Sequence, residues 1–89
     1  MKVDKSVLTL EGELTIDHAP QLRQLLLEMV QQHPAGVMVE ASRVTGMDVA
    51  ILQLLVSARL TWEALGGKLT WRARPAVIEK LLEETGLSL

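Results

Sequence analysis

The segment VMVEASRVTGMDVAILQLLVSARL, residues 37–60, limits the possible folds more than any other part of the chain. It opens with a short apolar run, Val37–Val39, which is typical of a strand covered on both faces of a sheet. We expect a loop at Ser42–Met47 and then a helix at Val49–Leu65 that is apolar almost all round. One sheet covers only one side of a helix. The segment therefore predicts an α/β core with an excess of apolar surface, which suits a protein partner.

Patterns of apolar residues place the other strands. One strand is expected at Val7–Leu10, and a second at Leu14–Ile16 after a bend or bulge at Gly12. Another is expected at Leu69–Trp71, after a turn at the two consecutive glycines that close the second helix.

Helix starts are marked by residues typical of amino-terminal caps. Asp17 is expected to cap the first helix, with Pro20 in its first turn, and Asp48 is expected to cap the second. A third helix is expected to begin at Pro75. The order β-β-α-β-α-β-α predicts one α/β domain over residues 1–89, in which about three helices pack on a mixed sheet of four or five strands.

Charge and composition argue against several classes of function. The net charge is −2 and no basic stripe is present to neutralise phosphates, so we expect no nucleic-acid ligand. The chain has no cysteine, and His18 and His33 fall in different elements, so we expect no metal, no cofactor and no enzyme activity. There is no apolar run of about 18 residues and no signal peptide, so we expect a cytoplasmic protein that does not insert into a membrane.

The second helix carries apolar residues on two sides. On a helical wheel, the side expected to face the sheet holds Ile51, Leu54, Leu55, Ala58 and Trp62. The opposite side carries a ridge made of Val49, Val56 and Leu60. Gln53 lies beside the ridge, and Met47 lies at its start. This ridge is covered by a neighbouring helix, or is scattered exposed aliphatic surface, or is a docking surface rimmed by polar side chains.

Two features near the end of the chain have alternative interpretations. Lys68, Arg72 and Arg74 form a small basic patch near Trp71, which suits either an acidic partner or a solvated strand edge. The last segment, Leu87–Leu89, is too short to complete an edge strand, and an exposed edge can pair with another molecule. We therefore expect a monomer or a weak dimer.

Several short segments, taken in their order and spacing, resemble a known family. They are LEGELTI at 10–16 followed by APQL at 19–22, VEASRVTGMD at 39–48, LQLL at 52–55 and ETGL at 84–87. In these segments the chain resembles STAS domains, the fold of anti-sigma factor antagonists and their relatives. The resemblance covers essentially the whole chain and implies a STAS-like α/β fold.

The resemblance also implies where such domains are switched. In the family, the Asp before the second helix is followed by Ser or Thr, a small residue and Gly-Leu, and a partner kinase phosphorylates the hydroxyl. Here Asp48 and Ala50 match, whereas Val49 occupies the phosphoacceptor position and has no hydroxyl to modify. Ser42 and Thr45 are turn-forming residues or, alternatively, sites to which phosphorylation has moved.

The function that the resemblance implies is a non-enzymatic protein-interaction module. Its partner would be an anti-sigma factor-like kinase or a chemotaxis-type regulator. One alternative is a STAS subunit of a lipid or ABC-type transport complex, and another is a domain that binds a small ligand such as a nucleotide. The partner-binding residues expected on the second helix and the residues before it are Met47, Asp48, Val49, Gln53, Val56 and Leu60.

Overall fold

Four strands form one mixed sheet in the computed structural model, which describes residues Met1–Leu89. The strands are β1 Lys2–Asp4, β2 Val7–Leu14, β3 Gly36–Met47 and β4 Lys68–Ala73. They lie in the order β1-β2-β3-β4. The first pair is antiparallel and the other two pairs are parallel, so the long strand β3 lies between two parallel neighbours.

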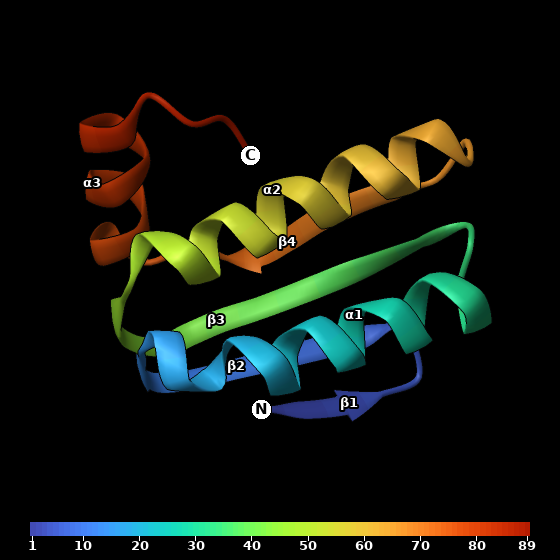
Figure 1. Cartoon of the computed structure of the whole chain (residues 1–89), viewed down its shortest axis with the longest axis horizontal. Helices are drawn as coiled ribbons and strands as arrows, with labels where there is room; N and C mark the ends of the chain where they lie inside the picture. Colours follow the sequence, from blue (N-terminus) through green and yellow to red (C-terminus); the bar gives the residue numbers. More distant parts are fainter.

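Three α-helices and one short 3-10 helix connect and cover the strands. They are η1 Ile16–His18, α1 Ala19–Gln32, α2 Val49–Ala64 and α3 Ala76–Thr85. Helices α1 and α2 lie side by side on one face of the sheet, and α3 stands across their direction at one end (Figure 1). This arrangement confirms the predicted α/β fold with a mixed sheet and three helices. None of the helices combines the length and the apolar character needed to cross a lipid bilayer.

The core between the sheet and the helices is aliphatic except for one tryptophan. Alternate residues of β2 and β3 point into it, as the period of a strand requires. Trp62 of α2 is fully buried, and its Nε1–H donates to the carbonyl oxygen of His33 at 2.8 Å. This hydrogen bond joins α2 to the residue that ends α1.

Strand β3 extends through the segment that the sequence predicted to be a loop. Ser42–Met47 belongs to β3, so the predicted loop is wrong. The segment is held by parallel pairing, in which Gly12 of β2 lies opposite Val44 and Leu14 lies opposite Met47. The polar residues that suggested a loop are exposed, whereas Val44 is buried in the core. A strand that has one face in solvent can hold polar residues on that face and still remain continuous.

The beginning of the chain also differs from the prediction. Strand β2 is continuous through Gly12, which has a φ of 75° and lies at a register shift in the pairing with β3. The bulge is therefore confirmed, but it does not separate two strands. The additional strand is the short β1 instead, and Ile16 begins η1 rather than ending a strand.

The predicted cap of the first helix is wrong: Asp17 lies within η1, and His18 is the amino-terminal cap residue of α1. Thr15, not Asp17, occupies the amino-terminal cap position of η1, and its backbone N–H donates to His18 Nδ1 at 3.0 Å. Helix α1 follows at once, with Pro20 in its first turn as predicted. His18 therefore acts as a local capping acceptor, which leaves Asp17 exposed.

The two glycines after α2 allow a matched test of chain packing. A Cβ on Gly67 would lie 2.4 Å from the carbonyl oxygen of Pro34, whereas a Cβ on Gly66 would meet nothing within 4 Å. We expect Gly67→Ala to destabilise the protein by about 2–3 kcal/mol, because the clash is with backbone atoms that cannot rotate away. Gly66→Ala should lower stability by only about 1 kcal/mol, the strain of a left-handed residue, since its φ is 82°. Urea unfolding of both variants measures the difference, and equal losses would contradict this account.

Candidate functional site

The carboxyl ends of β2 and β3 are joined by Asp48. Its backbone N–H donates to the carbonyl oxygen of Leu14 at 2.9 Å. Its side-chain Oδ2 accepts the backbone N–H of Ile16 at 2.7 Å. The two bonds run in opposite directions between the same two chain segments. The start of α2 and the start of η1 are therefore held in a fixed relation.

The position of Asp48 was predicted correctly, but the role of its side chain was not. Asp48 is the amino-terminal cap residue of α2 by position, yet its carboxylate makes no hydrogen bond to that helix. Only its carbonyl oxygen does so, accepting the N–H groups of Ile51 at 3.0 Å and Leu52 at 3.2 Å. The carboxylate turns to Ile16 instead, because the chain leaving β2 presents an N–H group that has no strand partner.

Apolar side chains are exposed on both segments that Asp48 joins. Ile16 is 62% exposed and Val49 is 41% exposed. A hollow of about 430 Å³ runs from Ile16 past Pro20 to Ala50 and Leu54 of α2. We call these four residues, together with Val49 next to Ala50 at the start of α2, the amino-end patch. Large apolar residues that are held rigidly and exposed together are typical of a surface that binds another protein.

The predicted partner-binding residues fall into two places. Asp48 and Val49 are exposed at the beginning of α2, and Met47 beside them is half-buried against the core. Leu60 is 56% exposed, but it lies 11 residues after Val49, about 16 Å along the helix. Gln53 is exposed between the two ends of the ridge, whereas Val56, the middle residue of the ridge, is half-buried. No neighbouring helix covers Val49 or Leu60.

The predicted sheet-facing side of α2 is correct except for one residue. Leu52 is fully buried, although it was not assigned to that side. Leu54 was assigned to it, but it is half-buried and lines a hollow between α1 and α2 with Leu27. The arc of α2 that is covered is wider than a sheet alone would cover, since α1 packs beside it.

Ile16 is the most exposed residue of this site that the sequence did not predict as partner-binding; Pro20, Ala50 and Leu54 were not predicted as such either. The apolar pattern around Ile16 predicts the end of a strand, and therefore a place in the sheet. The signal available was weak: a large apolar residue followed directly by Asp17, before a helix with its own complete apolar face. Only the pairing of β2 with β3 shows that the strand ends earlier and that Ile16 is placed beside α2.

The hydroxyl groups nearest in sequence to Val49 lie on β3. Ser42 and Thr45 are exposed strand residues, so neither is part of a flexible loop. The backbone N–H of Ser42 donates to Glu40 Oε1 at 2.7 Å. Hydrogen bonds from Ser42, followed by the charges of Arg72 and Arg43, lower the pKa of the Glu40 carboxyl. No group of three or more His, Cys, Asp and Glu side chains is placed to hold a metal ion.

Removal of the Asp48 carboxylate should weaken the connection between the two segments. We expect Asp48→Ala to lower the free energy of unfolding by about 1 kcal/mol, because the N–H of Ile16 loses a charged acceptor. Asp48→Asn keeps an acceptor oxygen and should lose about half as much. Asp17→Ala is the matched control, since the structure gives Asp17 no capping bond, and it should stay within about 0.5 kcal/mol of the parent. A larger loss for Asp17→Ala than for Asp48→Ala in urea unfolding would contradict the observed bonds.

Comparison with known proteins identifies the fold family. A family model described as "Mlab, STAS domain" matches residues 1–88. The match covers almost the whole chain, and it confirms the family resemblance that the sequence segments carried. Among curated proteins, none gives a significant match to this sequence.

Proposed function

Because the chain belongs to the STAS-domain family, we propose that it is a non-enzymatic docking module that binds a partner protein through the amino-end patch. The proposal rests on the two hydrogen bonds of Asp48 to Leu14 and Ile16. They hold two exposed apolar residues of different segments, Ile16 and Val49, in a fixed relation. A preorganised apolar surface loses little conformational entropy when it binds. The surface therefore suits a stable protein contact better than a chemical reaction.

The proposed contact is permanent rather than switched by phosphorylation. The family resemblance places the phosphoacceptor at the residue after the Asp, and Val49 there has no hydroxyl. A phosphate on residue 49 would add charge to the amino-end patch and would disrupt an apolar contact. The valine removes that means of release and adds apolar surface to the same place.

Two classes of partner follow from the family resemblance. The first is an anti-sigma factor-like kinase or a chemotaxis-type regulator, and the second is the transport complex in which STAS subunits of lipid or ABC-type systems take part. Val49 favours the second class, because a subunit of a stable assembly needs no phosphorylation step for release. Co-expression with the proteins encoded beside this chain, followed by affinity purification, tests both classes directly.

Charged substitutions should separate docking from folding. We expect Val49→Asp and Ile16→Asp each to weaken partner binding by about 2 kcal/mol, about 30-fold in Kd, if these residues are central to the contact. Stability should change by no more than about 1 kcal/mol, since neither residue is buried and an acidic residue is favourable in the first turn of a helix. Titration calorimetry and thermal melts measure the two effects.

Two further variants serve as controls for that experiment. Ile51→Asp places a charge at a fully buried position and should unfold the protein, which shows what a core substitution does. Leu60→Asp lies at the far end of the ridge and should leave binding unchanged if contact is limited to the amino-end patch. Equal weakening by Leu60→Asp would extend the contact along α2. Normal binding by both Val49→Asp and Ile16→Asp would refute the proposed site.

The absence of a switch can be tested with a kinase that co-purifies with the protein. We expect no phosphate on the parent chain, whereas Val49→Ser restores the acceptor and should be modified if the kinase still recognises the segment. Mass spectrometry locates any phosphate. Modification of Ser42 or Thr45 in the parent would show that the contact is regulated elsewhere on β3, contrary to the proposal. A large rise in Tm with ATP would instead favour the nucleotide-binding alternative.

A further inference from the structure

Strand β4 has one side that pairs with no other strand. It is the last strand of the sheet, and β3 is its only neighbour. The N–H of Lys68 donates toward β3, to the carbonyl oxygen of Ala35 at 3.3 Å. Since the direction of N–H groups alternates along a strand, those of Leu69 and Trp71 point to the open side. No backbone hydrogen bond joins that side to another segment. Such an edge is a template for an additional strand.

The side chains along this edge are positively charged. Lys68 and Arg72 are exposed and, with Thr70 between them, lie on the face of β4 opposite to buried Leu69. Neither cation forms an ion pair, whereas Arg74 is paired with Glu79. The charge of Arg72 acts on the Glu40 carboxyl of β3, but this carboxylate already accepts a hydrogen bond from Ser42. The two cations are therefore available to an acidic strand laid beside β4.

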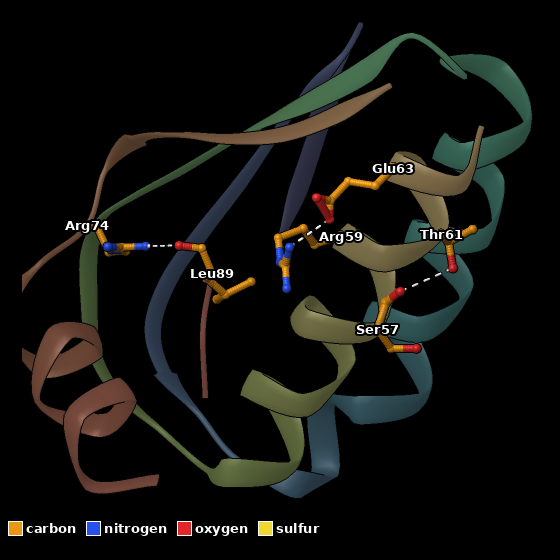
Figure 2. Close-up of polar contacts among 6 residues, drawn as sticks. All are labelled: Ser57, Arg59, Thr61, Glu63, Arg74 and Leu89. Carbon is orange, nitrogen blue, oxygen red and sulfur yellow. Dashed lines mark hydrogen bonds and ion pairs between the residues drawn. The ribbon is translucent and has the colours of Figure 1, made fainter. Parts of the chain in front are cut away.

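On the helix side of the edge there is a hollow, and two buried side-chain N–H groups there lack hydrogen-bond partners. A hollow of about 400 Å³ lies between the end of α2 and the first half of β4, lined by Arg59, Glu63 and the segment 66–70. Arg59 turns to Glu63 with Nη1 and Oε2 2.6 Å apart, and its Nε is buried without a hydrogen-bond partner (Figure 2). The buried Nε1 of Trp71 also lacks a partner. Inward side chains of an added strand would have space here.

The last residues of the chain limit the length of the open edge. Nη1 of Arg74 donates to the carbonyl oxygen of Leu89 at 2.8 Å, so the final segment lies at the carboxyl end of β4 (Figure 2). The open part therefore runs from Lys68 to Arg72. The pairing of β4 with β3 shifts register after Trp71, but exposed and less exposed residues still alternate through Arg72.

We propose that the open edge of β4, from Lys68 to Arg72, binds an extended acidic segment of a partner protein as a fifth strand. Acidic residues four positions apart in that segment would lie opposite Lys68 and Arg72 on the exposed face. The residues between them would alternate, with apolar side chains directed toward Leu69 and Trp71. Opposite charges across neighbouring strands stabilise the pairing, and like charges weaken it.

A second copy of this chain is a poor occupant of the same edge. Two copies of β4 can pair symmetrically in an antiparallel arrangement, with their exposed faces on the same side of the joined sheet. When the two strands overlap along their whole open length, Lys68 of one copy lies opposite Arg72 of the other. Both outer pairs would then be cation against cation. The other open strand, β1, spans only Lys2–Asp4, which is too short to cover the edge. The charges therefore select a different, acidic partner.

The test uses the full chain and a blocked synthetic peptide, Glu-Val-Thr-Val-Glu. The sequence of this peptide reads the same in both directions, so it pairs with β4 in either orientation. The matched control peptide replaces both Glu residues by Lys. We expect the Glu peptide to bind at least about tenfold more tightly, since both outer pairs change sign between the two peptides. NMR hydrogen exchange should show new protection of the Leu69 and Trp71 amides with the Glu peptide alone.

A charge-swapped protein completes the test. The double variant Lys68→Glu and Arg72→Glu changes only exposed side chains, and it should prefer the Lys peptide. Equal affinity of the parent for both peptides, or protection at β1 instead of β4, would overturn the proposal. Protection of Leu69 and Trp71 that rises with protein concentration in the absence of peptide would also overturn it, in favour of self-pairing. Val49→Asp should leave peptide binding intact, so failure of this proposal is distinguishable from failure of docking at the amino-end patch.

Discussion

The parallel pairing of β3 with β2 is the interaction on which the rest of the structure depends. It keeps the second half of β3 extended through Val44 to Met47, and so decides where α2 begins. It also brings the end of β2 to the same edge of the sheet, within hydrogen-bond distance of Asp48. If this pairing were shorter, Ile16 and Val49 would have no fixed relation and the amino-end patch would not exist.

Much of the architecture could be predicted from local patterns. The order of the elements from α1 onward, the extent of α2 and the start of α3 after Pro75 all follow from residues close together in the sequence. Their signals are apolar periods and chain-breaking residues, which act within a few positions. The Gly66-Gly67 turn belongs to the same class, although the reason Gly67 is needed, its approach to Pro34, is visible only in three dimensions.

The errors occurred where distant segments decide the local structure. Ser42–Met47 has the composition of a loop, but its backbone groups find partners on β2, about 30 residues earlier in the chain. Asp48 looked like a helix cap, and its carboxylate instead serves the N–H of Ile16, which no short-range rule connects to it. The candidate site was therefore predicted in part: Val49 was among the expected partner-binding residues, whereas Ile16 and Leu54 were expected to belong to the sheet or to face it.

The two tryptophans of the chain occupy very different surroundings, and they are its only aromatic residues. Trp62 is sealed in the core with its indole N–H bonded to His33, whereas Trp71 is half-buried on β4 beneath the guanidinium of Arg74. The intrinsic fluorescence therefore comes from one emitter in the core and one on the edge strand, with no tyrosine to obscure them. In a Trp62→Phe background, emission would report on the β4 edge alone, and quenching by iodide or acrylamide would reveal from spectroscopy whether that edge is open or covered.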